Sequence, residues 1–266
     1  MIAQHRAERG LAIERADFIE GMAKGMAVLE SFDTERQRLN ATLASQRAGI
    51  TRAAARRHLL TLTHLGYLET DGSYFWLSPK VLRFSGSYLA SARLPRAVQP
   101  MLNRLAAQTQ QSFSAVVLDG DEVVIVAQSG VRGAPARMLA YGLHLGARLP
   151  VHATSTGRML LAALSPTAVS AWCAGRTLPR LTPLTSTRMA DFRRKVARAR
   201  ADDFCLSAEE HELGVQALAV PLRNMQGHTV AALNVVVSPQ RVDEDSMRRD
   251  LLPLLIEAAR EARGLL

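Results

Sequence analysis

The stretch from residue 40 to residue 77 restricts the fold of this chain more than any other part of the sequence. It begins with Asn40 to Arg47, which predicts a short helix. Ala48-Gly49-Ile50 then predicts a tight turn, because glycine adopts a positive φ without steric cost. Thr51 follows as a candidate N-cap, since its hydroxyl can accept a hydrogen bond from a free N–H group at a helix start.

The next helix of this pattern is predicted over 52–65. Its buried side is expected to carry Ala55, Leu59 and Leu62. Strand-like segments follow at 67–70 and 73–77, joined through Asp71-Gly72, a dipeptide typical of tight hairpins. Helix, turn, helix and hairpin in this order predict a winged helix-turn-helix, a fold that places its second helix in the major groove of DNA.

The exposed side of this helix is basic near its start. A helical wheel places Ala53, Arg56 and Arg57 opposite the buried side, with Thr51 and Arg52 at the N-terminal end. Arginine can bind the O6 and N7 atoms of guanine or clamp a phosphate, and small residues allow a close approach to thymine methyl groups. We therefore expect these five residues to contact double-stranded DNA.

Lys80, just beyond the hairpin, is a further candidate for a phosphate contact. The formal net charge of +9 favours polyanionic partners, but a basic helix is often only a solvated surface. A nucleic-acid architectural protein without sequence preference is another alternative, and it would not distinguish an operator from random DNA. The order of turn, helix and hairpin favours specific DNA binding over both alternatives.

The residues before this pattern complete the first domain. Residues 1–17 mix charges of both signs and predict a mobile arm. From Glu20 onward, Met22, Met26 and Leu29 recur at helical spacing, and we expect them to form a buried stripe on a first helix. A DNA-binding domain is therefore predicted over 18–80.

The remainder of the chain predicts a helical linker over 81–96, whose helix from Val81 to Ala92 stops before Pro95, and a second domain over 97–266. An amphipathic helix containing Val98 to Leu105 opens this domain. Further strands are predicted at 113–118, 122–127, 215–222 and 230–237, helices at 156–164 and 192–200, a loop at 131–136 and a final helix that begins or kinks at Pro253. Helices and strands mix without a βαβ repeat, which predicts an α+β fold with helices packed on a sheet.

Composition limits the class of protein. Hydrophobic residues make up 48% of the chain, enough for two cores, yet no apolar run reaches the ~20 residues of a membrane span. The first residues lack the apolar segment of a signal peptide, so a cytoplasmic protein without membrane contact is expected. Cys173 and Cys205 are expected to be free thiols, and the spacing of the histidines fits no zinc site. We predict no metal and no cofactor.

Five segments resemble the IclR family of bacterial transcriptional regulators, in the family's order and over about residues 18 to 265. They are GMAKGMAVLESF, GITRAAARRHLLTLTHLGYLETDGSYFWLSPKVLRF, LGARLPVHATSTGRMLLAAL, EEHELGVQALAVPLRN and VAALNVVVSP. Within the family, the combination of AKGMAVLESF, ERQRLN, TRAAARRHL and YFWLSPKVLRFS looks closest to regulators of β-ketoadipate-pathway genes, which respond to 4-hydroxybenzoate, protocatechuate or related aromatic acids. The resemblance implies a GAF-like effector-binding domain and a homodimer or dimer of dimers on a palindromic or repeated operator.

The resemblance also implies an effector site in the second domain. Ser155 and Thr156, at a helix start, would meet a carboxylate, which suits their hydroxyls and the free N–H groups there. An aromatic ring would be covered by Met138 and Tyr141. Four strand residues would face the same effector site: Val215, Ala217, Asn234 and Val236. A regulator that responds to a non-aromatic metabolite is the main alternative.

An enzyme is an alternative of a different class. Ser155 or Thr156 would be the nucleophile and His152 the base of a hydrolase or transferase. The sequence lacks a G-x-S-x-G elbow around either residue, and no third group that would orient the histidine is apparent. We therefore predict no catalytic residues and expect a regulator that binds its effector without turnover.

Overall fold

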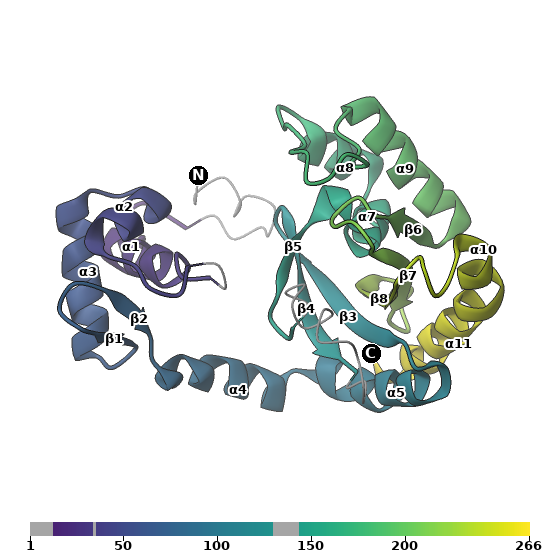
Figure 1. The fold of residues 1–266 in the computed structure, drawn as a ribbon, viewed down its shortest axis with the longest axis horizontal. Helices are drawn as coiled ribbons and strands as arrows, with labels where there is room; N and C mark the ends of the chain where they lie inside the picture. Colours follow the sequence, from purple (N-terminus) through teal and green to yellow (C-terminus); the bar gives the residue numbers. More distant parts are fainter. Residues whose placement is uncertain (1–12, 34–35, 130–143) are drawn as a thin grey trace. The chain divides into compact units, whose positions relative to one another are not determined.

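The computed structural model describes residues 13–33, 36–129 and 144–266, and the chain divides into two compact units, Met1–Ser91 and Ala92–Leu266. Figure 1 shows the helices and strands of each unit. Within the described residues, no helix combines the length and apolar character needed to span a membrane. The predicted loop at 131–136 lies outside the described residues.

The first unit contains α1 (Glu20–Leu29), α2 (Ala41–Ala48), α3 (Arg52–His64), β1 (Leu68–Thr70), β2 (Phe75–Leu77) and α4 (Leu82–Ser91). The predicted order of helices, turn and hairpin is confirmed. Gly49 ends α2 with a φ of 65°, and the Thr51 hydroxyl accepts a hydrogen bond of 3.3 Å from the Ala54 N–H group. The strands pair antiparallel, with Leu68 opposite Leu77.

The core of this unit confirms one predicted stripe and corrects another. Ala55, Leu59 and Leu62 of α3 are buried as expected. Met22 and Met26 of α1 are not, because their side chains are 67% and 49% exposed. The buried face of α1 instead carries Ala27 and Val28, together with Phe32 just beyond the helix. Small side chains let α1 approach α3, and Gly25 comes close to His58 there.

The second unit is built around one antiparallel sheet of order β5-β4-β3-β8-β7-β6. Its strands are β3 (Ser112–Asp119), β4 (Glu122–Gln128), β5 (Arg148–Pro150), β6 (Cys205–Ala208), β7 (Gln216–Arg223) and β8 (Thr229–Val237). Its helices are α5 (Arg93–Thr109), α7 (Ser155–Ala162), α8 (Pro166–Cys173), α9 (Met189–Asp202), α10 (Glu244–Ser246) and α11 (Leu252–Ala262). The predicted α+β fold is confirmed.

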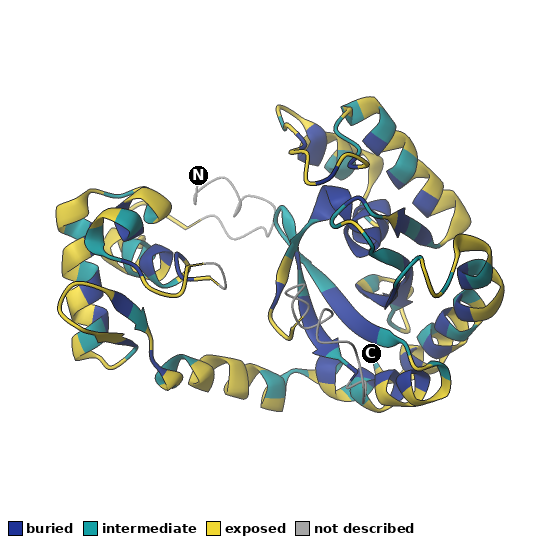
Figure 2. Ribbon diagram, viewed as in Figure 1, coloured by how far each residue is buried: buried dark blue, intermediate teal, exposed yellow. Residues whose placement is uncertain are grey.

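Helices cover both faces of this sheet (Figure 1). On one face, α5 and α11 pack against Phe113 of β3 and Leu233 of β8. On the other face, α7, α8 and α9 pack against Val116 of β3 and Ala232 of β8. Because side chains alternate along a strand, neighbouring positions of β3 and β8 serve opposite layers. The strands between the two helical layers are largely buried (Figure 2).

Prolines mark two helix starts in this unit. The linker helix α4 ends at Ser91, and α5 begins at Arg93 with Pro95 in its first turn. Proline is tolerated there because its missing N–H group would have no partner in the helix. Pro253 is the second residue of α11 and follows a π-helical turn, Met247–Leu251, which confirms that the last helix has a new start at this proline.

Helix α7 approaches the preceding chain so closely that only glycine fits at one position. A Cβ atom on Gly157 would lie 2.3 Å from the carbonyl oxygen of Val151. Val151 begins a short 3-10 turn, Val151–Ala153, that leads into α7. The Thr154 hydroxyl caps the helix by accepting a hydrogen bond of 3.2 Å from the Gly157 N–H group. These contacts fix the start of α7 against the chain that precedes it.

A buried ion pair ties α7 to the loop between β6 and β7. The guanidinium of Arg158 donates two hydrogen bonds, of 2.7 and 2.5 Å, to the carboxylate of Glu210. These side chains are only 1% and 6% exposed. Arg158 also donates to the His152 carbonyl oxygen at 2.9 and 3.1 Å, and Lys195 of α9 donates to Glu210 at 2.9 Å. Burial alone would raise the pKa of Glu210, but Arg158 and Lys195 outweigh it and lower this pKa.

We predict that Gly157→Ala destabilises the second unit by about 1–3 kcal/mol or more, because the added methyl group overlaps backbone atoms that cannot move independently. Gly86→Ala in α4 is the matched control, since nothing lies within 4 Å of a Cβ atom there and alanine favours a helix. Calorimetric unfolding should show a lower Tm for Gly157→Ala and an unchanged or higher Tm for Gly86→Ala. Equal changes in Tm for the two variants would contradict the close approach of α7 to Val151.

We predict that Glu210→Gln costs about 3–5 kcal/mol of unfolding free energy at pH 7, because it leaves the buried Arg158 charge uncompensated. The control is Glu261→Gln, which removes an exposed partner of Arg104 and should cost less than about 1 kcal/mol. Since the folded-state pKa of Glu210 lies below its ordinary value of 4.5, the pair stabilises the fold above that pH. Urea unfolding of wild type and Glu210→Gln should converge as the pH falls through the folded-state pKa.

Candidate functional site

The exposed side of α3 carries the residues that sequence reasoning assigned to DNA. Arg52, Ala53, Arg56 and Arg57 are exposed, as is the N-cap Thr51. Among the described residues, none of these arginines forms an ion pair or a side-chain hydrogen bond. The first turns of α3 therefore present three unengaged guanidinium groups beside a small alanine. This arrangement suits insertion into the major groove and contact with phosphates.

Lys80 lies at the other end of this helix. Its ammonium donates a hydrogen bond of 2.7 Å to the carbonyl oxygen of Leu65 and lies 4.8 Å from the ring centre of Tyr67. α3 has 13 residues and is about 20 Å long, so Lys80 is far from the Thr51 end. A cation at the carboxyl end of a helix satisfies free carbonyl groups and complements the helix dipole. The structure thus gives Lys80 a contact that the sequence did not indicate.

The hairpin after α3 has a basic residue that sequence reasoning missed. The guanidinium of Arg38 lies 4.9 Å from the ring centre of Trp76 and 5.6 Å from that of Tyr74. It also pairs with Asp71 in the turn. Arg38 precedes α2 in the sequence, so no local spacing pattern indicated this contact. It supports the shape of the hairpin and engages the acidic residue at its tip.

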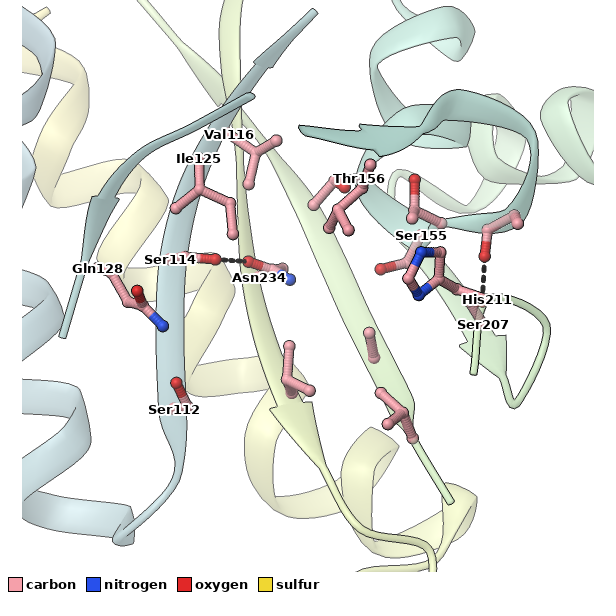
Figure 3. Close-up of a pocket in the computed structure, with 16 residues that line it drawn as sticks. Ser112, Ser114, Val116, Ile125, Gln128, Ser155, Thr156, Ser207, His211 and Asn234 are labelled. Atoms are coloured by element: carbon pink, nitrogen blue, oxygen red, sulfur yellow. Dashed lines mark hydrogen bonds between the residues drawn. The ribbon is translucent and has the colours of Figure 1, made fainter. Parts of the chain in front are cut away.

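A pocket in the second unit lies where the start of α7 meets the sheet (Figure 3). It includes six of the residues predicted for the effector: Ser155, Thr156, Val215, Ala217, Asn234 and Val236. The other lining residues are Ser112, Ser114, Val116, Ile125, Gln128, Leu149, Ala153, Thr154, Ser207 and His211. Met138 and Tyr141, predicted to cover a ring, lie outside the described residues.

The α7 end of the pocket offers unused hydrogen-bond donors. The Oγ atom of Ser155 is buried and has no hydrogen-bond partner among the described residues, although the side chain lines the pocket. The N–H groups of Ser155 and Thr156 occupy the first two helical positions, which lack partners within a helix. Thr154 caps Gly157 instead. A buried hydroxyl and free amides at a positive helix end suit an anionic group such as a carboxylate.

The sheet side of the pocket is polar at one place. Ser114 of β3 lies opposite Asn234 of β8 in the strand register, and its hydroxyl donates a hydrogen bond of 2.5 Å to the Asn234 Oδ1 atom. Ser112 lies two residues earlier on β3 and faces the same side. Sequence reasoning found Asn234 but missed the serines. The alternation Ser112-Phe113-Ser114 at the start of an apolar strand was the available signal.

His211 is the one titratable side chain among the described residues that line this pocket, and no Lys or Arg is among them. Burial, with a smaller effect from nearby His152, lowers the pKa of His211 below its ordinary value of 6.5. The imidazole is therefore mostly neutral at pH 7. Among the described lining residues, the groups available to a bound anion are therefore neutral donors and the start of helix α7.

The arrangement does not fit the alternative of a serine nucleophile with a histidine base. The Nε2 atom of His152 bonds to the Pro179 carbonyl oxygen at 2.9 Å, whereas Ser155 Oγ has no partner within the described residues. Nor do the described residues contain a cluster of three His, Cys, Asp or Glu side chains that could hold a metal ion. The geometry favours binding of a small molecule over chemistry on it.

Comparison with known families gives two matches that together cover most of the chain. Residues 21–72 match the IclR helix-turn-helix domain. Residues 86–263 match the C-terminal domain of the bacterial transcriptional regulator IclR. The first match covers α1 to the hairpin turn, and the second covers the sheet with its helices.

Two relatives come from Acinetobacter baylyi. The Pca operon regulatory protein is 50% identical over 262 residues, which cover 98% of this chain and 94% of that protein. The p-hydroxybenzoate hydroxylase transcriptional activator is 51% identical over 254 residues, which cover 95% of this chain and 94% of that protein. Both relatives are regulators of transcription, so they do not support the alternative of a hydrolase.

Two solved structures share the fold. One is the inducer-binding domain of a PobR double mutant from Acinetobacter in complex with 3-hydroxybenzoic acid, with 46% identity and a TM-score of 0.60, covering 65% of this chain and 98% of that chain. The other is an IclR homolog from Microbacterium hydrocarbonoxydans in complex with 4-hydroxybenzoate, with 26% identity and a TM-score of 0.73, covering 93% of this chain and 99% of that chain. With its winged helix-turn-helix, its second unit and these matches, the chain belongs to the IclR family of bacterial transcriptional regulators.

Proposed function

We propose that this regulator controls genes of aromatic-acid catabolism and that its effector is a small aromatic carboxylate such as 4-hydroxybenzoate or protocatechuate. The observation that carries the proposal is the buried hydroxyl of Ser155 at the start of α7, which has no hydrogen-bond partner among the described residues and lies in a pocket with apolar walls. A buried polar group without a partner is costly, and a ligand carboxylate would satisfy it. Two similar proteins regulate Pca and p-hydroxybenzoate hydroxylase genes, and two solved relatives bind hydroxybenzoates, which supports the same chemistry here.

The apolar walls suit the ring of such a ligand. Val116 and Ile125 line the pocket beside the polar groups, with Val236 of β8 and with Val215, the residue just before β7. Apolar surface stabilises a ring on burial, and the few polar groups then fix its orientation. The proposed effector site comprises the six predicted lining residues together with Ser114 and His211.

On the DNA side, we propose that α3 reads the operator through Arg52, Ala53, Arg56 and Arg57, with Thr51 at its start. A homodimer or dimer of dimers would present pairs of these helices to a palindromic or repeated site. The regulator would act in the cytoplasm, where bacterial DNA lies. An effector changes operator affinity only if it binds two states of the protein unequally.

We predict that 4-hydroxybenzoate and 3,4-dihydroxybenzoate raise the Tm of the full-length protein, because a ligand that binds only the folded state stabilises it. Ser155→Ala should weaken this binding by roughly tenfold or more, as expected for the loss of a hydrogen bond to a charged group. Ser170→Ala, at an exposed position of α8, is the control and should bind like wild type. Stabilisation by adipate or succinate, with none by any aromatic acid, would instead establish a non-aromatic effector.

We predict that Arg56→Ala and Arg57→Ala each weaken binding to a selected operator by about 1–3 kcal/mol without lowering Tm, because both side chains are exposed and unengaged in the described structure. The operator is obtained by selecting bound duplexes from a random pool with the wild-type protein. Arg198→Ala, at an exposed position of α9, is the control and should leave affinity unchanged. Equal affinity of wild type for selected and random duplexes would favour an architectural protein.

A further inference from the structure

The hydrogen bond between Ser114 and Asn234 determines which groups on the sheet side of the pocket can donate a hydrogen bond and which can accept one. The Ser114 hydroxyl donates its single proton to Oδ1 of Asn234, and both side chains are buried. The carbonyl end of the amide is therefore occupied, and Figure 3 shows the amide nitrogen on the side that faces away from Ser114. In the described structure, this nitrogen donates to no protein group. Both residues line the pocket.

This bond leaves two complementary groups available to a ligand. The single hydroxyl proton of Ser114 is already used in the bond to Asn234, so toward a ligand Ser114 Oγ can only accept a hydrogen bond. The Asn234 Nδ2 atom can only donate. A hydroxyl group both donates and accepts, and it can satisfy both groups at once. A carboxylate can only accept, so one placed here would face the lone pairs of Ser114.

The bond is not needed to join the strands. Ser114 and Asn234 are register partners on β3 and β8, and this pairing runs from Ser112 opposite Val236 to Val116 opposite Ala232. The backbone ladder already holds these strands together. Apolar side chains fill most of the other positions of β8, from Ala231 to Val237. A polar pair inside such a strand, at the wall of a pocket, is better explained by a ligand than by folding.

We infer that the Ser114–Asn234 pair reads a hydroxyl substituent on the ring of the effector. The inference rests on the proposed function, in which the carboxylate of the same ligand lies at the α7 end near Ser155. The ligand hydroxyl donates to Ser114 Oγ and accepts from Asn234 Nδ2. The pair thereby selects hydroxybenzoates over unsubstituted benzoate and over benzenedicarboxylates.

The test compares ligands by calorimetric titration of the full-length protein. The probes are benzoate, 3-hydroxybenzoate, 4-hydroxybenzoate, isophthalate and terephthalate. Wild type should bind the better hydroxybenzoate about tenfold or more tightly than benzoate, the effect of a net hydrogen-bond gain inside a pocket built for it. Each dicarboxylate should bind more weakly than benzoate, because its second carboxylate meets an acceptor in a buried place.

The variant removes both partners together. In Ser114→Ala/Asn234→Leu no buried polar atom of the pair is left unsatisfied, and such apolar replacement is often nearly neutral for stability. The double variant should bind benzoate at least as tightly as the wild type does. Its preference for hydroxybenzoate should disappear, so that the two ligands bind with roughly equal affinity. Ser112→Ala is the matched control, since Ser112 lines the same pocket on the same strand and should keep the preference.

The outcomes separate this inference from the proposed function. If benzoates bind and the double variant keeps the wild-type preference, the hydroxyl-reading role is wrong while the aromatic effector stands. If neither benzoate nor a hydroxybenzoate binds the wild type, both ideas fail together. If the double variant does not fold, the order of ligand affinities for the wild type decides. A dicarboxylate that binds the wild type as tightly as a hydroxybenzoate overturns the inference.

Discussion

The second unit depends on a buried ion pair between Arg158, in the helix that lines its pocket, and Glu210. Arg158 points from α7 away from the solvent and meets the Glu210 carboxylate with two hydrogen bonds. Removing two charges from water is costly, and the pair is tolerated because the remaining donors and acceptors are also satisfied. Arg158 reaches the carbonyl of His152, and Glu210 accepts from Lys195 and from the backbone N–H of Ser186. One network thus joins the start of α7 and the turn before it to α9, to the chain before α9 and to the loop between β6 and β7.

This network explains how the pocket can be polar although none of the described residues that line it is charged. The residue before Arg158 is Gly157, whose missing side chain lets α7 press against Val151. The Arg158–Glu210 pair and the contact between Gly157 and Val151 hold the start of α7 in place. The first amides of α7 and the hydroxyl of Ser155 therefore face the pocket in fixed positions. Preorganised neutral donors can hold an anion in a dry site, where electrostatic interactions are stronger than in water. The buried charges position the site and do not themselves enter it.

Much of the first unit could be predicted because its determinants are local. Gly49 at a turn, Thr51 at a helix start and Asp71-Gly72 in a hairpin each act on neighbouring residues, and the structure has all three features as expected. The buried stripe of α1 could not be predicted in the same way. Met22 and Met26 have the spacing of a core face, but the neighbouring helices contact the side of α1 that carries Ala27 and Val28.

By itself, the sequence determined the order of helices, turn and hairpin in the first unit, the α+β fold and, to within one residue, the start of the helix that lines the pocket, since periodicity, caps and turns act over a few residues. It also indicated Asn234 as a polar residue in an apolar strand. It did not indicate the short strands β5 and β6 or the helix α8. Only the tertiary structure showed that Asn234 meets Ser114, that Glu210 is the partner of Arg158, and that Lys80 caps α3. Each of these pairs joins residues distant in sequence, and strand register and helix packing, which no local pattern encodes, decide which side chains meet.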